Sequence, residues 1–193
     1  MKRVLCLLSA LLMLACSTPQ LQEPLQYDFG SLRSTTSPAL PPIMVSDVHA
    51  PIWLDSNRMI YRLAYANEQQ MRAYAHSRWI MPPAQLFEQR LKARIAQAGG
   101  TVLSASDGAT NLPQVRLEAE NFSHVFDSPT QSAAQVAVRV SVLRGRSLIA
   151  QKSFARHEPA GSADASGSAA AMAVASDAVI TDVIAWLAGL PIK

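Results

Sequence analysis

The sequence predicts an α/β fold of the α+β type, in which a mostly antiparallel sheet carries two main helices on one face. Three observations lead to this prediction. Residues 114–157 alternate apolar and polar side chains over three successive segments, as antiparallel strands do. Residues 83–98 and 169–188 instead repeat apolar side chains at helical spacing. Hydrophobic residues make up 49% of the 193-residue chain, which is enough for the core of one domain.

The elements before the first helix are predicted to be short strands and loops. One strand over residues 26–30 ends at Gly30, and a second covers residues 43–48. Residues 31–42 between them are rich in Ser, Thr and Pro, which predicts a loop, and residues 50–55 turn the chain.

A hairpin is predicted over residues 59–79. In residues 59–66 the side chains of Tyr61, Leu63 and Tyr65 fall on one face of a strand. The following residues, from 70 onward, pair with this strand across an Asn-Glu turn. A helix is the competing interpretation for this second half, because Gln, Met, Arg and Ala favour helices. We adopt the strand.

The first main helix is predicted to begin at Pro82-Pro83, because proline is tolerated in the first turn, and to end at Gly99-Gly100. Between these ends the apolar residues at helical spacing are Leu86, Phe87, Leu91, Ile95 and Ala98. A short strand over residues 101–104 and a loop over residues 106–111 follow.

The meander is predicted to consist of three strands, over residues 114–126, 132–143 and 147–157. In the middle strand every second position from Val136 to Val142 is valine, which specifies the face that turns inward. In the first strand the alternation slips after Ala119, which predicts a β-bulge.

The final helix is predicted over residues 169–188, after a loop of small residues over 159–168. Its apolar side is formed by Met172, Val179, Val183, Trp186 and Leu187. The first half is nearly all alanine, which permits a close approach to a sheet. Gly189 and Pro191 end the helix.

The N-terminus predicts a lipoprotein signal peptide over residues 1–15. Met1-Lys2-Arg3 forms the positively charged n-region that is typical of signal peptides. The apolar run over residues 4–14 is too short for the roughly 20 residues of a membrane-spanning helix. It leads into Met13-Leu14-Ala15-Cys16, which resembles the bacterial lipobox. We therefore expect cleavage between Ala15 and Cys16.

Lipid attached to Cys16 would anchor the rest of the chain to a membrane. The thiol is predicted to take an S-diacylglyceryl group and the freed amine an N-acyl chain such as palmitate. Each buried methylene contributes about 0.8 kcal/mol, so two or three chains form a durable anchor. In bacterial lipoproteins, an Asp directly after the modified cysteine favours retention in the inner membrane. Here that position is occupied by Ser17, so we predict that the protein is sorted to the outer membrane. Residues 16–25 then form a lipidated tether, and residues 26–193 form a periplasmic domain. The alternative is an ordinary secretory leader, in which the cysteine at position 16 is coincidental.

Charge and cysteine content exclude several classes of function. The chain has 17 Lys and Arg against 14 Asp and Glu, and two of the basic residues belong to the leader. The mature domain is therefore near neutral and offers no electrostatic case for binding nucleic acid. Both cysteines, Cys6 and Cys16, lie in the first sixteen residues, so the body has no disulfide, CxxC pair or thiolate metal cluster.

No catalytic or metal-binding pattern is found in the body. The four histidines do not lie at metal-ligand spacing: His49, His76, His124 and His157. A P-loop and a GxSxG nucleophile elbow are both absent from the sequence. Glu118 and Glu120 are interpreted as solvated strand positions. We therefore predict no enzyme, no catalytic residue, no metal and no cofactor.

Two groups of side chains allow a functional and a structural interpretation. The aromatic group is formed by Tyr61, Tyr65, Tyr74 and Trp79, with Trp53 as a similar case. It is either a surface for lipid or a partner or, as we favour, ordinary core. The basic group is formed by Arg62, Arg72, Arg78, Arg90, Lys92 and Arg94. It is either a face for phospholipid headgroups or an acidic partner or, as we favour, a solvated helix face.

Several stretches, taken in order, carry a resemblance that covers almost the whole mature chain. They are residues 27–30, 50–55, 59–62, 74–79 leading into Pro82-Pro83, 122–127, 159–165 and the closing alanine-rich helix with Trp186-Leu187. No single stretch is specific, but the ordered set resembles the ABC-type transport auxiliary lipoprotein component family, the PqiC/YmbA-like proteins.

This resemblance implies a non-enzymatic auxiliary subunit of an Mce-type intermembrane lipid transport system. The implied partners are Mce-domain proteins and an inner-membrane permease with its ATPase, and the chain would dock or receive the Mce assembly at the outer membrane. Self-association into a homo-oligomeric ring is a further hypothesis. Two alternatives stay open, namely a lipid-carrying lipoprotein with its own apolar cavity and a lipid-anchored hydrolase.

Overall fold

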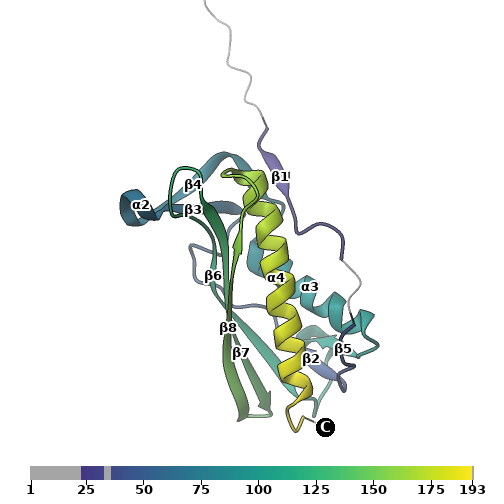
Figure 1. Ribbon diagram of the computed structural model, residues 1–193. Helices are drawn as coiled ribbons and strands as arrows, with labels where there is room; N and C mark the ends of the chain where they lie inside the picture. Colours follow the sequence, from purple (N-terminus) through teal and green to yellow (C-terminus); the bar gives the residue numbers. More distant parts are fainter. Residues whose placement is uncertain (1–22, 33–35, 193) are drawn as a thin grey trace, which may run out of the picture.

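One long strand, β6 (Gln114–Phe126), organises the sheet in the computed structural model, which describes residues 23–32 and 36–192 (Figure 1). One edge of β6 pairs antiparallel with β7 (Ser132–Arg144) along its whole length. The other edge is shared between two strands. Its C-terminal part pairs parallel with β3 (Arg58–Leu63), and its N-terminal part pairs parallel with β2 (Ile43–Val45).

The remaining strands extend this sheet to eight strands in total. β8 (Ser147–Pro159) pairs antiparallel with β7 at one edge. β4 (Glu68–Trp79) pairs antiparallel with β3, and the short strand β1 (Leu25–Tyr27) pairs parallel with β4. β5 (Val102–Ser104) pairs parallel with β2. Most paired residues belong to the three antiparallel pairs, as predicted.

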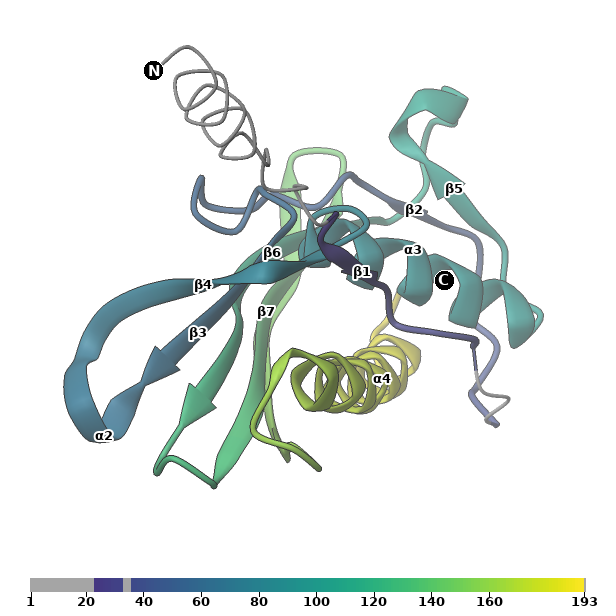
Figure 2. The ribbon, with the colours of Figure 1, turned by 90° about the horizontal axis from the view of Figure 1, so that it is seen from above.

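The two main helices, α3 (Pro83–Gln97) and α4 (Ala165–Ala188), lie on the same face of the sheet (Figure 2). This arrangement confirms the predicted fold class. Two single turns complete the part of the chain that the structure describes: α2 (Ala64–Asn67) joins β3 to β4, and the 3-10 helix η2 (Ala105–Asp107) follows β5.

The core lies between α4 and the long strands. The inward side chains of β7, from Ala134 to Val142, are each at most 1% exposed. The side chains that α4 turns toward the sheet are equally buried: Val179, Ile180, Val183, Ile184 and Leu187. Each fully buried Val, Leu or Ile contributes about 1.5–3 kcal/mol, so the valine face predicted for β7 contributes substantially to the stability of the fold.

The predicted bulge is present, and so is the predicted hairpin, although its connection differs. The first strand ends at Leu63 rather than at residue 66, and the turn α2 (Ala64–Asn67), which includes Tyr65, joins the two strands. β3 and β4 pair antiparallel, which excludes the competing helix over residues 70–79. The register of β6 against β7 shifts between Ala119 and Asn121, where the alternation of the sequence slips.

Helix α4 begins four residues before its predicted start. Asp164 is its N-cap, and the carboxylate accepts a hydrogen bond of 2.8 Å from the backbone N–H of Gly167. The prediction at residue 169 was wrong because Gly and Ser at the start of α4 suggested a continuing loop, whereas an aspartate cap satisfies the free N–H groups there. By length and mean hydropathy (1.6) α4 is able to cross a membrane, but half of its apolar window is buried in the domain.

Candidate functional site

The predicted lipidation site, Cys16, and its neighbours Ala15 and Ser17 lie outside the described residues. The described chain starts at Glu23 and enters the domain through β1. This end of the molecule is opposite the C-terminal end of α4 (Figure 1).

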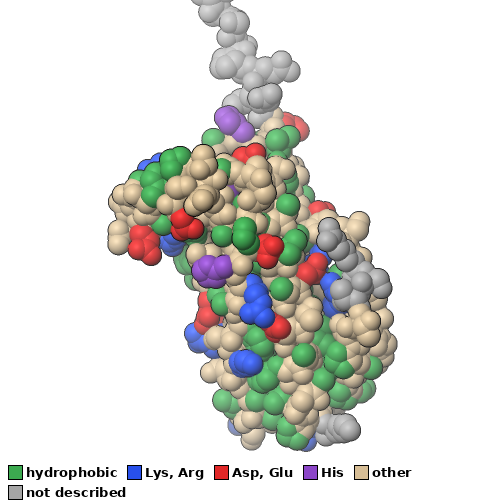
Figure 3. Space-filling view, viewed as in Figure 1, with side chains coloured by type: hydrophobic (Ala, Val, Ile, Leu, Met, Phe, Trp, Pro, Cys, Tyr) green, Lys and Arg blue, Asp and Glu red, His purple; other side chains and the backbone are tan. Residues whose placement is uncertain are grey.

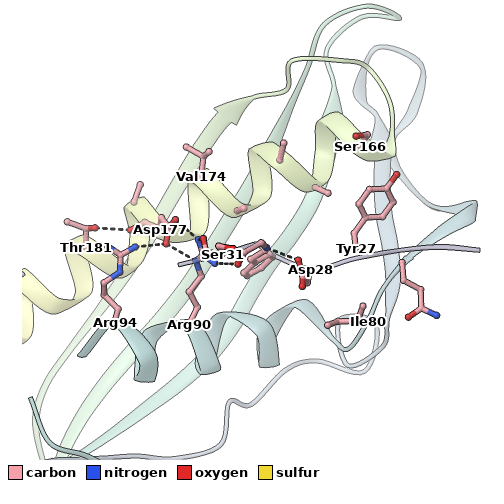
Figure 4. A pocket seen from close by; sticks show the side chains of 17 residues that line it. Tyr27, Asp28, Ser31, Ile80, Arg90, Arg94, Ser166, Val174, Asp177 and Thr181 are labelled. Carbon is pink, nitrogen blue, oxygen red and sulfur yellow. Dashed lines mark hydrogen bonds and ion pairs between the residues drawn. The ribbon is translucent and has the colours of Figure 1, made fainter. Parts of the chain in front are cut away.

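A groove of about 920 Å³ lies between α3, α4 and residues 26–31 (Figure 4). The side of α4 that lines it carries mainly small or apolar side chains: Ser166, Ala170, Ala173, Val174, Ala178 and Thr181. Tyr27, Phe29 and Ile80 line it from the other side. Val174 is 42% exposed and Ile80 is 48% exposed. The groove is therefore an apolar surface open to solvent, and Figure 3 shows exposed hydrophobic side chains between scattered charges on the α4 side of the molecule.

Three charged side chains meet beside this apolar surface. Arg90 donates from Nε and Nη2 to the two carboxylate oxygens of Asp177, at 2.7 Å each. Arg94 donates from Nη2 to Oδ1 of the same carboxylate at 2.9 Å. Arg90 also donates to the carbonyl of Gly30 at 3.0 Å, which ties α3 to the segment after β1. Gly30 has a φ of 66°, a conformation that favours glycine.

The charges at this position do not cancel. Two guanidinium groups face one carboxylate, and the side chains of Arg90, Arg94 and Asp177 are 8%, 1% and 21% exposed. Burial alone would raise the pKa of Asp177, but the hydrogen bonds and charges of Arg90 and Arg94 outweigh burial and hold that pKa below its ordinary value. Nε and Nη1 of Arg94 have no hydrogen-bond partner among the described residues.

The prediction of a solvated basic face was wrong for Arg90 and Arg94. Both are buried on the side of α3 that faces α4, whereas Arg62 and Arg72 lie on the hairpin of β3 and β4. A signal was available, because Arg90 and Arg94 continue the apolar stripe of Phe87 at helical spacing.

The predicted aromatic group separates into different environments. Tyr61 and Tyr74 pack together with ring centroids 4.7 Å apart, beside His124. Trp79 is 1% exposed and contacts Phe29 in the core, whereas Tyr65 is 49% exposed on α2. The favoured structural interpretation therefore holds for Trp79 and fails for Tyr65.

His124 is the one histidine buried among the described residues. The side chain is 0% exposed, and Nδ1 lies 2.9 Å from the hydroxyl oxygen of Tyr74. Burial lowers the pKa of His124 to about 4, although the charge of Asp164 opposes this shift. Burial, with the charges of Asp164 and Tyr61, raises the pKa of the Tyr74 hydroxyl. Both side chains are therefore neutral at pH 7.

Acidic side chains elsewhere have ordinary structural roles. Glu118 and Glu120 both form ion pairs with Arg139 on β7, and Glu118 is 47% exposed, as expected for a solvated strand position. Glu88 on α3 accepts from the backbone N–H of Val48 and pairs with Lys92, each at 2.7 Å. Within residues 23–32 and 36–192, three or more His, Cys, Asp or Glu side chains nowhere come together in a group suited to a metal ion.

Two solved structures share this fold. Protein XCC0632 from Xanthomonas campestris has a TM-score of 0.74 and 20% identity, over 83% of this chain and 93% of that protein. An uncharacterized protein has a TM-score of 0.63 and 13% identity, over 86% of this chain and 99% of that protein. At these identities the likeness concerns the fold alone. No curated protein matches the sequence.

The family is shown by a model that matches most of the chain. The model of the ABC-type transport auxiliary lipoprotein component covers residues 28–184, from the segment after β1 to the last turns of α4. The Arg90–Asp177–Arg94 cluster lies within this range, and so do the residues that line the groove apart from Gln26 and Tyr27. The chain therefore belongs to the ABC-type transport auxiliary lipoprotein component family.

Proposed function

We propose that this protein is a lipoprotein of the outer membrane, facing the periplasm, that serves as a non-enzymatic auxiliary subunit of an Mce-type lipid transport system. The observation that carries this proposal is the family match over residues 28–184, which assigns the domain to ABC-type transport. The tetrad Met13-Leu14-Ala15-Cys16 supports a lipid anchor ahead of that domain, and Ser17 supports sorting to the outer membrane.

The anchor is tested by replacing the two cysteines one at a time. Cys16→Ala is expected to abolish acylation and release the domain from membranes, because no thiol remains at the cleavage site. Cys6→Ala is the matched control, since Cys6 lies inside the apolar run of the leader and is not expected to carry lipid. Membrane fractionation with radiolabelled palmitate measures both effects. Continued membrane association of Cys16→Ala would refute the anchor.

The domain itself is proposed to dock or receive the periplasm-spanning Mce assembly, whose inner-membrane side is a permease with its ATPase. Ring-like self-association would suit a tubular partner. Affinity capture of the lipidated chain, with mass spectrometry of the recovered proteins, tests the partner part of the proposal.

A second candidate function is lipid carriage by the domain. The groove beside α4 favours it, because a volume of about 920 Å³ lies in the range of small-molecule sites and two large apolar side chains, Ile80 and Val174, are exposed in it. Mass spectrometry of lipid that copurifies with the captured protein tests this candidate separately from docking.

A further inference from the structure

Two buried arginines share one counter-ion at a defined position beside the groove. Arg90 and Arg94 on α3 share one counter-ion, Asp177, so one positive charge is left without a partner of opposite sign inside this cluster. The other acidic side chain that lines the groove, Asp28, is exposed and accepts a hydrogen bond from the backbone N–H of Gly30. Because charged groups are seldom buried without compensation, this excess of positive charge in the cluster favours an anion as the missing partner.

Arg94 is the arginine of this cluster some of whose hydrogen-bond donors are left without partners in the described part of the chain. Its side chain is 1% exposed, and only Nη2 is engaged, with Asp177. Nε and Nη1 are enclosed and lack a partner among the described residues, although Arg94 lines the groove. A buried N–H without a partner destabilises the fold. An anion that reached these nitrogens, once the side chains that cover them had moved, would supply the missing acceptors.

The rest of the groove suits an alkyl chain. The part of α4 that lines it runs from Ser166 to Thr181, and 15 steps of 1.5 Å give a length of about 22 Å. Along this length Asp177 is the one charged side chain from α4. The α4 side of the groove therefore combines an elongated, mainly apolar wall with a charged cluster near one end, while Asp28 lines the opposite side. An apolar wall with charge near one end is the pattern that suits an amphipathic ligand.

We propose that this groove binds a single-chain amphiphile with an anionic headgroup, a fatty acid or a lysophospholipid. The headgroup lies beside Arg90, Arg94 and Asp177, and the chain follows α4 past Val174 toward Tyr27. Arg94 supplies the N–H groups that select the anion, and Arg90 holds Asp177 in place. This inference rests on the second candidate function, lipid carriage, and is independent of docking.

The test uses photo-crosslinking of the lipidated full chain in phosphatidylcholine nanodiscs. The probe is a 16-carbon fatty acid with a mid-chain diazirine, and the comparison probe is the uncharged alcohol of the same length. Peptide mass spectrometry locates the labelled residues. The expected result is labelling by the acid between residues 166 and 181 and at Tyr27 or Ile80, about tenfold above the alcohol, as one charge-assisted hydrogen bond predicts.

Three variants separate the chain site from the headgroup site. Val174→Asp is expected to abolish groove labelling by both probes, because it places a carboxylate on the apolar wall. Leu148→Asp is the matched control: Leu148 is 58% exposed on β8, away from the groove, and labelling stays unchanged. Arg94→Met is expected to remove the preference for the acid while the Arg90–Asp177 pair persists. A thermal melt confirms that each variant is folded.

Equal labelling by acid and alcohol, or an unchanged preference in Arg94→Met, overturns the anionic headgroup and leaves lipid carriage standing. Absence of label from the groove overturns both the anionic headgroup and lipid carriage. A photoreactive amino acid placed at position 174 gives a second measurement, and its cross-linking to another polypeptide would also overturn both. Displacement of the acid by millimolar inorganic phosphate shows a site for the free anion and overturns the amphiphile.

Discussion

Asp177 on α4 joins this helix to α3 through two arginines. Its carboxylate accepts hydrogen bonds from Arg90 and Arg94, which are nearly or fully buried. Removing a carboxylate from a buried cluster leaves its cations without compensation, which costs more than the pair contributed.

Asp177→Asn is therefore expected to destabilise the fold by about 3–5 kcal/mol, measured by urea unfolding at pH 7. Asp182→Asn is the control on the same helix, because Asp182 pairs with Arg156 where both side chains are more than a third exposed. Exposed pairs contribute at most about 1 kcal/mol, so this variant should change little. Equal losses in the two variants would contradict a special role for the buried cluster.

His124 makes the stability of the domain depend on pH. Its pKa is about 4 in the folded protein against an ordinary value of 6.5. The unfolded chain takes up a proton below about pH 6.5, whereas the folded chain does so only near pH 4, so stability is lost as pH falls between these values. At about 1.4 kcal/mol per pKa unit the loss amounts to about 3 kcal/mol.

Urea unfolding between pH 7.5 and pH 4 measures this loss. His124→Gln removes the titrating group and should flatten the curve, whereas His76→Gln, at an exposed position of β4, should leave the slope unchanged. Protonation of Asp177, whose pKa is held below its ordinary value, affects stability only at more acidic pH. An unchanged slope in His124→Gln would show that another group titrates in this window.

The residues of the groove were only partly predictable from the sequence. The spacing of Arg90 and Arg94 after Phe87 places them on the apolar side of α3, which is readable from periodicity. Their partner is not readable, because Asp177 lies more than 80 residues away and a single sequence holds no information on which distant side chains meet.

The start of α4 has no room for a side chain at Gly167. An added Cβ at Gly167 would lie 2.1 Å from the carbonyl oxygen of Ser162, which is closer than atoms can approach. The turn over residues 162–167 is fixed by hydrogen bonds from the Ser162 hydroxyl and the Gly167 N–H to Asp164.

Gly167→Ala is expected to cost about 1–3 kcal/mol, because the loop must move to admit the methyl group. Gly161→Ala is the matched control, since an added Cβ there meets no atom within 4 Å. Thermal unfolding of both variants measures the difference. Equal melting temperatures of the two variants would contradict this prediction, because they would mean that the loop around Ser162 admits the methyl group without a loss of stability.

At the scale of elements, local patterns predicted the long strands and the helix α3 well. Alternation over residues 132–143 fixes the inward face of β7, and Pro and Gly mark the ends of α3 within one or two residues. The parallel pairs of β6 with β2 and β3 were not predictable, because these strands are separated by other elements and share no turn that signals their pairing.

The whole molecule joins a predicted anchor at its N-terminal end to a domain with an open groove. The chain enters the domain through β1, next to the residues 26–31 that line the groove. The family match supports a role in transport, whereas the docking surface is not readable from periodicity, because exposed side chains carry no fixed spacing. Under the proposed function, the anchor would determine where the domain works and the partner would determine what it does.

The central claim is that the lipidated chain works as a subunit of an Mce-type transport system. Affinity capture of the native full chain from cross-linked membranes, followed by quantitative mass spectrometry, tests it most directly. A fusion of residues 1–25 to an unrelated periplasmic domain controls for proteins that merely share the membrane. The account predicts enrichment of an Mce-domain protein and its permease with the native chain over this control. Recovery of neither protein above the control would contradict it.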